Sequence, residues 1–575
     1  MQMSASPMKK QGKCHRVMGM PENRARYYLL VGFIGVLAAA LTCGSYLLYS
    51  NMLAETFAVV KTAAWYYFLF ALLALSASYA TVRVFAETKS TGSSTHLVLE
   101  KYHLSNGEIS VRDASAKTVA SIFTLGFGGS AGPEGPSLLV GGGVASYISR
   151  RLNIRIRHTR RIFISGAAAG LAAVFRTPLT GILFALEIPY RNDLDMEAFI
   201  EASVASIPAY LMSVFILGSE RIFGQAEGGQ AGLNEILLSV ILGLICGGYA
   251  VFFTETFSMA GRVRNTLKNK MGNTGTIMLG VFLLGLVGFF STYSIGVGTH
   301  FVDAMVSGAS FTVAMLLTTI LLKTLATAVT LNFGGSGGLF FPTIVIGAGI
   351  GYLFSSLLDV NFRILFVAVG MAALLSGTHK VLLTPTAFVV ETLGGGCAIP
   401  ALLASAVSYV VSGSSSFYPI QPRSRLKAEE LALEKFFTKA KTTMHEKMSR
   451  TFAGEFMTKQ PVSIHSGMTV KDAMETFEKT RFRALPVTDD NLKIEGAVTL
   501  EDLGNVADKH ANETLSETLM HKALIVTEQT SLEEVAERMI KTEEDHAFVV
   551  DENQKLVGVI AGIDVVRKIV ELSTS

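Results

Sequence analysis

The chain has 575 residues, of which 50% are hydrophobic and only 17% are charged. Soluble globular domains carry about a quarter charged residues, so this composition excludes an ordinary water-soluble protein. The formal net charge of +3 favours no class of partner, because a chain that crosses a membrane does not present one surface to its partners.

Six long runs contain no aspartate, glutamate, lysine or arginine, and several are long enough to cross a bilayer as a helix, which takes about 20 apolar residues. These runs are 27–49, 62–82, 236–254, 271–299, 324–358 and 392–422. One such run could be the core of a soluble protein, but six of them are not plausible as core. The sequence therefore predicts a polytopic α-helical membrane protein.

The first apolar run follows six basic residues within positions 1–26. This run is too long for the apolar core of a signal peptide, so we expect an uncleaved membrane helix. The positive-inside rule places the N-terminus and the arginine-rich stretch 150–161 in the cytoplasm. Nucleic-acid binding is the alternative interpretation of that stretch, but the apolar runs that flank it argue against this.

Two glycine-rich segments of the membrane part match each other. Residues 128–137 read GGSAGPEGPS and residues 334–343 read GGSGGLFFPT, so that three glycines, a serine and a proline recur 206 positions later. A second match follows in both halves: Thr180, Phe184 and Glu187 recur as Thr384, Phe388 and Glu391. Two related halves are typical of transporters whose binding sites form at the repeat interface. The sequence leaves open whether the halves are inverted.

Glycine and proline in these two segments predict breaks between short helices. Within a membrane, non-helical backbone survives only where it lines a cavity or is buried in protein. Pro136 and Pro342 suit the first turn of a following helix, where no amide hydrogen is needed. The free amides at such a helix start can bind an anion, and they bind it weakly enough to release it.

Glu134 carries the only charge between Thr118 and Ser149. An acidic residue inside a membrane segment costs about 2.5–3.5 kcal/mol on insertion scales and is a functional hypothesis by default. A carboxylate among these amides can occupy the anion site in place of chloride, and protonation would release it. We therefore predict that Glu134 gates the pathway and accepts a proton. The alternative is a buried glutamate that backbone amides satisfy, with no further role.

These segments resemble the CLC family of chloride channels and proton–chloride exchangers, over roughly residues 27–422. The family's GREGP segment appears as GPEGP at 132–136, and its GxFxP segment appears as GLFFP at 338–342. The resemblance implies that Glu134 is the external gating glutamate and that Lys117 stands where the family often carries a lysine. It also implies a set of anion-binding residues: Ser93, Gly135, Leu339, Phe340 and Tyr418.

Three positions depart from the family's pattern. The GSGIP segment is reduced to GSSTH, in which Ser93 keeps the hydroxyl group, and Pro133 replaces the arginine of GREGP. Exchangers often place an internal proton-transfer glutamate just after the position of Glu187, where this chain has Ile188. Isoleucine cannot carry a proton, so water or Glu187 would have to serve, and the choice between channel and exchanger stays open.

The composition changes near Arg423, after which charges are frequent. The tail contains its own repeat, in which Gly496–Asp502 matches Gly558–Asp564 at a distance of 62 positions. Each unit is predicted to run strand, helix, strand, strand, helix. The tail resembles a tandem pair of CBS domains over about 453–573.

The resemblance to CBS domains implies that the tail binds an adenosine nucleotide. Three residues would then contact the ribose or lie beside it: Thr499, Asp502 and Asp564. In the second unit Ala561 replaces the hydroxyl residue that Thr499 provides in the first. A purely structural or dimer-forming tail is the alternative.

The predicted fold class is a polytopic α-helical membrane protein with two repeated halves and short, interrupted helices, followed by a soluble α/β tandem CBS domain. We expect five parts: a cytoplasmic segment 1–26, a membrane domain 27–422, a charged connector 423–452, and CBS units 453–511 and 512–575. The CLC resemblance implies a homodimer, each subunit with its own pathway. We expect it in the cell membrane, with the N-terminus and the tail in the cytoplasm.

The predicted function is transport of chloride and similar monovalent anions, gated by the pore glutamate and regulated by the CBS pair, with proton coupling left open. A passive gated chloride channel and a fluoride exporter are alternatives, and a divalent-metal transporter with CBS domains is a remote one. A metal transporter predicts acidic residues in the pore, which the neutral glycine-rich segments lack. The sequence has no P-loop and no HExxH motif, so we expect no enzyme, no required cofactor, no metal site and no nucleic-acid partner.

Overall fold

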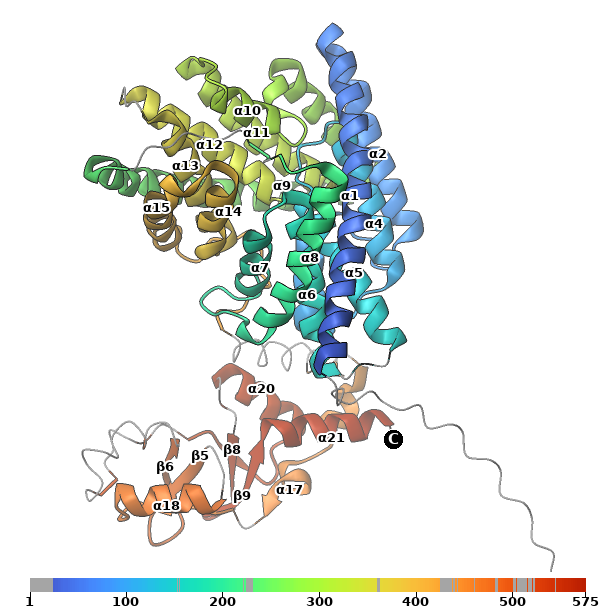
Figure 1. The fold of residues 1–575 in the computed structure, drawn as a ribbon. Helices are drawn as coiled ribbons and strands as arrows, with labels where there is room; N and C mark the ends of the chain where they lie inside the picture. Colours follow the sequence, from blue (N-terminus) through green and yellow to red (C-terminus); the bar gives the residue numbers. More distant parts are fainter. Residues whose placement is uncertain are drawn as a thin grey trace, which may run out of the picture. The chain divides into compact units, whose positions relative to one another are not determined.

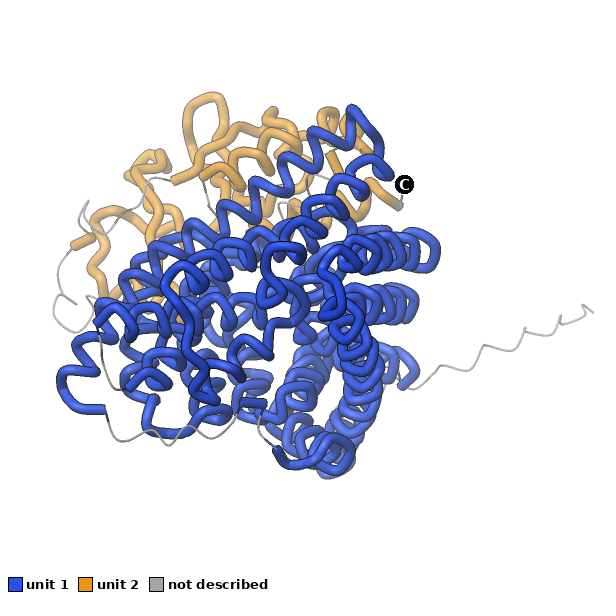
Figure 2. The backbone as a smooth tube through the Cα atoms, turned by 90° about the horizontal axis from the view of Figure 1, so that it is seen from above, with its two compact units in different colours: residues 1–425 blue, residues 426–575 orange. Residues whose placement is uncertain are grey.

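The computed structural model describes residues 24–574 with internal gaps. The residues outside the description within this range are 153, 155, 221, 224–230, 359–361, 425–436, 438–439, 442, 460, 481–483, 500–502, 504–513, 516–519, 521–522, 543 and 545. The chain divides into two compact units, Met1–Arg425 and Leu426–Ser575, which are coloured separately in Figure 2.

In the first half of the membrane unit, the described residues form helices and one short strand (Figure 1). Its main elements in chain order are α1 (Arg24–Thr62), α2 (Tyr67–Phe85), β1 (Gly92–Ser93), α3 (Ser94–Leu104), α4 (Val111–Gly126), α5 (Glu134–Arg151), α6 (Ile156–Phe175), α7 (Pro178–Glu187) and α8 (Phe199–Leu217). The first apolar run is thus part of a single long helix, as predicted.

The second half repeats this character. Its main elements are α9 (Leu233–Phe290), α10 (Thr299–Val306), α11 (Val313–Asn332), β2 (Ser336–Gly337), α12 (Phe340–Leu357), α13 (Arg363–His379), α14 (Leu383–Leu393) and α15 (Ala398–Val411). α9 is two helices joined at Gly272, whose φ of 69° lies in the left-handed region that favours glycine. This kink lies at the beginning of the second of the two apolar runs, 236–254 and 271–299, that overlap α9.

Within the described residues, six helical stretches are long and apolar enough to cross a membrane, and four apolar helical stretches are shorter. The predicted fold class of many apolar helices, some of them short, is therefore confirmed. The 324–358 run is not one helix, because the chain leaves α11 at Asn332 and resumes as α12 at Phe340.

The two glycine-rich segments cross each other at the centre of this unit. Gly132 and Gly338 form an antiparallel bridge, in which each amide donates to the other's carbonyl, at 3.0 and 2.8 Å. Two further contacts are also reciprocal: Ser130 N donates to Thr330 Oγ1 at 3.1 Å, and Ser336 N donates to Thr124 Oγ1 at 3.0 Å. The two halves are therefore related by a local two-fold axis, as expected of inverted repeats.

Glycine also lets the helices of each half approach closely. A methyl group added at Gly141 in α5 would stand 1.9 Å from the Gly166 carbonyl oxygen of α6. In the second half, a methyl group at Gly351 in α12 would stand 1.9 Å from the Phe366 carbonyl oxygen of α13. Close backbone packing of this kind is typical of membrane helices, where small residues take the place of a hydrophobic driving force.

The tail unit contains two similar α/β layers. The first has the sheet order β4-β5-β6, from β4 (Ile464–His465), β5 (Ala484–Thr488) and β6 (Ile494–Thr499), with α18 (Val470–Thr480). The second has the order β3-β9-β8-β7, from β3 (Thr458–Lys459), β7 (Ile525–Thr527), β8 (His546–Val550) and β9 (Leu556–Ala561), with α20 (Leu532–Thr542) and α21 (Gly562–Thr574). The predicted strand–helix–strand–strand–helix order is present in full in the second layer.

Candidate functional site

Glu134 begins α5 at the crossing of the two glycine-rich segments. Its side chain is buried, and its Oε1 accepts a hydrogen bond from the Phe340 amide at 2.5 Å. Phe340 is the first residue of α12, so the carboxylate lies at the positive end of that helix. The carboxylate therefore occupies the kind of position in which a helix start binds an anion.

The surrounding backbone leaves room only for hydrogens beside the carboxylate. A methyl group at Gly338 would stand 1.9 Å from Glu134 Oε1, and one at Gly132 would stand 2.0 Å from Oε2. Glu134 Oε2 is buried and has no hydrogen-bond partner among the described residues. One carboxylate oxygen is thus held by an amide, while the other lies in a tight, unsatisfied position.

Two further predicted residues lie at the same helix starts. Leu339 is the N-cap of α12 and is fully buried, directly before the amide that Glu134 holds. Gly135 is the second residue of α5, and a methyl group there would stand 3.0 Å from the Gly337 carbonyl oxygen. The structure therefore brings Glu134, Gly135, Leu339 and Phe340 together.

Tyr418 and Ser93 meet each other in the same unit. The Tyr418 side chain is buried, and the hydroxyl groups of Ser93 and Thr95 lie beside its phenol. Tyr418 is also within electrostatic range of Glu134. Ser93 is the N-cap of α3, and its hydroxyl accepts from the His96 amide at 3.4 Å. The start of α3 and the phenol of Tyr418 therefore lie together at residues 92–96, where the family's GSGIP segment is altered.

Two larger cavities lie at or next to these residues in the chain. The first, which we call the Ser93 cavity, has a volume of about 630 Å³ and is lined by Ser93 together with five basic side chains and one acidic one. These charged residues are Arg83, Lys89, Lys117, Arg264, Lys268 and Glu100. The second, the Pro133 cavity, has a volume of about 260 Å³, and Pro133 and Phe341 are among its lining residues. The excess of positive charge suits the Ser93 cavity to anions.

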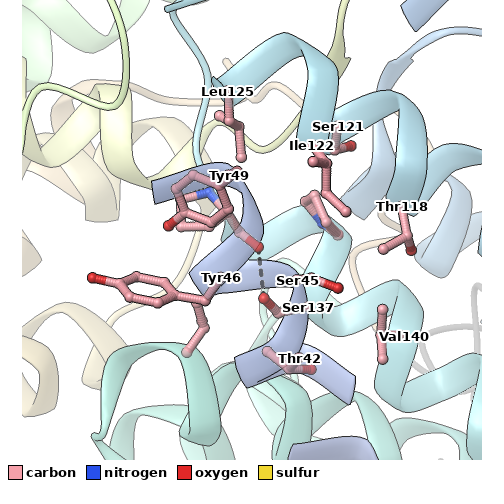
Figure 3. Close-up of a pocket in the computed structure, with 13 residues that line it drawn as sticks. Thr42, Ser45, Tyr46, Tyr49, Thr118, Ser121, Ile122, Leu125, Ser137 and Val140 are labelled. Atoms are coloured by element: carbon pink, nitrogen blue, oxygen red, sulfur yellow. Dashed lines mark hydrogen bonds between the residues drawn. The ribbon is translucent and has the colours of Figure 1, made fainter. Parts of the chain in front are cut away.

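A third, very small cavity lies between α1, α4 and α5 (Figure 3). Its volume is about 20 Å³, enough for about one water molecule. Ser137 lines it and donates to the Pro133 carbonyl oxygen at 2.7 Å, and Tyr49 lines it within electrostatic range of Glu134. Ser137 thus fixes the turn from which Glu134 projects.

The second sequence match has a structural explanation. Glu187, at the end of α7, accepts from three amides at the start of α14, those of Leu382, Leu383 and Thr384, at 3.0, 2.8 and 2.7 Å. It also accepts from the Thr384 hydroxyl at 2.5 Å. These four donors occupy both carboxylate oxygens, so Glu187 is held as a helix cap.

Glu391 makes equivalent contacts in the other direction, with one amide fewer. It lies in α14 and accepts from the amides of Leu179 and Thr180 in α7 at 3.0 and 2.8 Å, and from the Thr180 hydroxyl at 2.6 Å. Each repeat therefore supplies the carboxylate that caps a helix of the other. The internal proton-transfer role that the sequence left open for Glu187 has no free carboxylate oxygen to support it.

The sequence did not single out Lys323, which lies 206 positions after Lys117, the same offset as the glycine-rich match. Both side chains are buried. Lys117 lines the Ser93 cavity, while the Lys323 ammonium donates to the Gly296 carbonyl oxygen at 2.6 Å, close to Gly298 of the Pro133 cavity. Carrying the repeat offset beyond the glycine segments would have found it.

The predicted nucleotide residues are only partly described. Thr499 ends β6, and Asp502 lies outside the described residues. Asp564, in the first turn of α21, accepts from the Ala561 amide at 3.0 Å and lies 3.6 Å from the Arg567 guanidinium. Its carboxylate therefore caps its own helix, and 19% of the side chain is exposed.

The connector is joined to the second CBS layer by charge. The Lys441 ammonium lies 2.9 Å from Glu533 and also pairs with Glu537, and His445 Nδ1 lies 2.8 Å from Glu533. These contacts, led by the hydrogen bond from Lys441, hold the pKa of Glu533 below its usual value.

Among the described residues, no group of three or more histidine, cysteine or acidic side chains could hold a metal ion.

Fold and site together define a polytopic membrane transport protein, not an enzyme. The chain belongs to the voltage gated chloride channel family, whose pattern matches residues 68–413, and CBS domains match residues 453–506 and 515–571. The predicted resemblance to CLC proteins with a tandem CBS pair is therefore confirmed.

Several curated proteins are similar to this chain. An uncharacterized protein of Methanocaldococcus jannaschii is 27% identical over 286 residues, which is 50% of this chain and 71% of that protein. The H(+)/Cl(-) exchange transporter ClcA of Vibrio parahaemolyticus is 27% identical over 286 residues, 46% of this chain and 59% of that one. A chloride/fluoride channel protein of Pseudomonas syringae is 26% identical over 346 residues, 58% and 74% of the two chains. The chain thus spans about three fifths of the Vibrio relative.

Solved structures share the fold. A slow cyanobacterial Cl-/H+ antiporter has a TM-score of 0.61 at 20% identity, over 72% of this chain and 99% of that one. A CLC-type fluoride/proton antiporter has a TM-score of 0.60 at 21% identity, over 70% and 100%. A eukaryotic CLC transporter covers 94% of this chain and 98% of its own, with a TM-score of 0.57 at 18% identity.

Proposed function

We propose that this protein exchanges chloride for protons across a membrane, with Glu134 as the gate and the proton acceptor. The main observation behind the proposal is that the Glu134 carboxylate lies at the start of α12, where it accepts a hydrogen bond from the Phe340 amide. The similarity to the ClcA exchange transporter supports the pairing of chloride with protons.

The proposed cycle follows from competition for one position. The ionised carboxylate holds the Phe340 amide that an arriving chloride needs, so the anion can bind there only after Glu134 leaves. Protonation removes the negative charge that the helix start attracts, and the neutral acid then gives way to the anion. Because Glu134 Oε2 is already unsatisfied, the held position is not fully stabilised, which favours this release.

Chloride fits this pathway better than a divalent metal ion. The anion positions are backbone amides and hydroxyls, and the Ser93 cavity carries mostly basic side chains. Two alternatives have specific support. A passive channel is favoured by Ile188 and by the capped state of Glu187, which leave no carboxylate for an internal proton route at that point. Fluoride is the ion of one structural neighbour.

The experiment that tests the proposal is a liposome flux assay that reads chloride and pH together. We expect chloride efflux to drive proton uptake against a pH gradient. Chloride efflux without proton movement would replace the exchanger with the passive channel, and a preference for fluoride would replace the ion.

Selectivity gives a separate prediction. Neutral amides and hydroxyls should pass chloride, bromide and nitrate, all weakly hydrated monovalent anions, and should reject cations. Reversal potentials measured in planar bilayers should follow the chloride gradient when sodium and potassium are varied. Reversal potentials that track either cation would contradict the assignment to anions.

We propose further that the CBS pair, assigned to 453–511 and 512–575, regulates transport by binding an adenosine nucleotide. Thr499 offers a hydroxyl where the second layer has Ala561, so the site that contains Ala561 should be the weaker one. Asp564 has the carboxylate to accept ribose hydroxyls, although it also caps α21.

Calorimetry on the full chain with AMP, ADP and ATP tests this regulatory role. We expect binding that Thr499→Ala weakens by about tenfold, the value of one charge-free hydrogen bond of about 1.4 kcal/mol. Asp564→Asn should weaken it further while Asp551→Asn, in the loop between β8 and β9, should not. No heat with any of the three nucleotides would favour the structural role of the tail.

We propose a homodimer in the cell membrane with the N-terminus, the connector 423–452 and the tail in the cytoplasm. Large apolar side chains on α8 and α15 stand exposed and require cover by lipid or by a second copy: Ile207, Leu211, Phe215, Ile399 and Val410. Chemical cross-linking of the protein in liposomes, read as a dimer band, tests the assembly.

A further inference from the structure

His379, the last residue of α13, lies at the anion pathway although nothing in the function proposed above uses it. The side chain is fully buried. Its ring centroid lies 5.4 Å from that of Tyr418 and 6.1 Å from that of Phe340. The imidazole thus stands between two of the predicted anion-binding residues.

The hydrogen bonds of His379 fix which ring nitrogen is free. Its Nδ1 lies 2.9 Å from Thr378 Oγ1, and that hydroxyl lies 2.9 Å from the Leu374 carbonyl oxygen. A hydroxyl group has one proton to donate, and a carbonyl oxygen can only accept. The Thr378 hydroxyl therefore donates its hydrogen bond to the Leu374 carbonyl oxygen and accepts one from Nδ1–H of the ring. This assignment from the hydrogen-bond network leaves Nε2 without a proton.

Nε2 is therefore a bare acceptor. It is buried and has no hydrogen-bond partner among the described residues. A buried polar atom without a partner costs free energy, so its retention calls for a ligand or a proton. An apolar residue of similar shape would avoid the cost. The first repeat has such a residue, because the 204-residue offset that relates Thr180 to Thr384 places Phe175 opposite His379 in the comparison of the halves.

The same region lies beside Ile188, the position where exchangers often carry an internal proton-transfer glutamate. Gln421 donates from its Nε2 to the Ile188 carbonyl oxygen at 2.8 Å and to the His379 carbonyl oxygen at 3.2 Å. One buried side chain therefore ties the end of α7 to the end of α13. His379 therefore offers a base in the region where Ile188 offers none.

The charged and titratable groups around His379 are engaged with other partners. Lys380, its chain neighbour, holds Ser412 Oγ at 2.6 Å and the Tyr409 carbonyl oxygen at 3.3 Å. Glu187 of α7 is held by the start of α14. Tyr418 packs against the ring, and Glu134 of α5 holds the Phe340 amide. None of the described ion pairs includes His379.

We propose that His379 is a proton-transfer residue of this pathway, whose Nε2 takes up a proton while an anion is bound beside Tyr418 and gives it back when the anion leaves. The inference rests on the exchange function proposed above. In the step, the Glu134 carboxyl group loses a proton, which passes through water to the lone pair of Nε2. Carboxylic acid and neutral imidazole become carboxylate and imidazolium, and the reverse step restores both.

An anion beside the ring supplies the coupling. Opposite charges a few ångströms apart attract strongly where water is scarce, so a bound chloride stabilises the imidazolium, and the imidazolium holds the chloride. Proton uptake at His379 and anion occupancy beside Tyr418 then depend on each other, which links the binding of the two ions.

Flux through the full-length protein in liposomes tests this role. His379→Gln keeps a polar side chain but cannot be protonated, so chloride flux should persist while proton flux falls by about 100-fold, the usual contribution of a general base. His379→Asn serves as a second variant in case the first does not fold. His158→Gln, at a half-buried histidine that packs against Tyr27 in α1, is the matched control and should keep the wild-type ratio of the two fluxes.

A rescue experiment separates proton transfer from structure. Adding Ile188→Glu to His379→Gln supplies a carboxylate at the residue whose carbonyl oxygen shares Gln421 with that of His379, and it should restore proton flux. Wild-type protein that moves chloride without protons would refute the exchange function itself. If the wild type exchanges the two ions and His379→Gln or His379→Asn keeps the same ratio of proton to chloride flux, the role of His379 alone would be overturned.

Discussion

Replacing Glu134 with alanine should give chloride flux that no longer responds to pH and that carries no protons. In the wild type, the ionised carboxylate holds the Phe340 amide, and each protonation frees that position for an anion. Flux through the wild type should therefore rise as the pH on the Glu134 side falls, by at most about tenfold per pH unit for one titrating group. Without the carboxylate, the amide is always free and the pH response has no source.

Glu134→Gln refines this prediction, because glutamine imitates the protonated acid in shape. It should also uncouple chloride from protons, while passing less chloride than the alanine variant, since the amide still fills part of the position. Flux of both ions is read in the same liposomes across a series of pH values. A Glu134→Ala protein with the wild-type pH profile would show that this carboxylate is merely structural.

Gly338→Ala provides an independent control on the geometry. A methyl group there would stand 1.9 Å from Glu134 Oε1, so the carboxylate cannot keep its contact with the Phe340 amide. The variant should resemble Glu134→Ala in its weak response to pH, although the titrating group is still present. The comparison separates the loss of the charge from the loss of its position.

The sequence predicts the helical fold and the central crossing because both depend on local composition. Long uncharged runs identify the helices, and glycine and proline identify the interruptions. Glu134 is conspicuous because a single charge in an apolar segment is costly. The 206-residue offset predicts that the two segments are equivalent, but only the reciprocal bonds between Gly132 and Gly338 reveal the two-fold axis between them.

Other parts of the site depend on contacts that no local pattern records. His379 is one histidine at the end of an apolar helix, and its free Nε2 follows from the positions of Thr378 and Tyr418. A comparison of the two halves could have drawn attention to it, since the equivalent residue of the first repeat is Phe175. Lys323 is likewise visible only when the repeat is extended to Lys117. The capping of α14 by Glu187 needs the fold, because 195 to 197 residues separate the partners.

The second large effect should come from Glu187, whose loss should damage the fold more than transport chemistry. Its carboxylate satisfies three amides at the start of α14, and each buried group left without a partner costs about 1–3 kcal/mol. Glu187→Ala should therefore lower the free energy of unfolding by several kcal/mol. Glu187→Gln should also destabilise the fold, because its NH₂ group faces amide donors that need an acceptor.

Glu391→Ala is the matched control, because Glu391 caps α7 in the same way from the other repeat. Thermal unfolding of the detergent-solubilised protein should show both alanine variants melting well below the wild type. In the fraction of Glu187→Gln that folds, the ratio of chloride to proton flux should equal that of the wild type, since both oxygens of Glu187 are occupied by the helix cap. A folded Glu187→Gln protein that moves chloride but no protons would instead give Glu187 the internal proton-transfer role and would leave His379 without one.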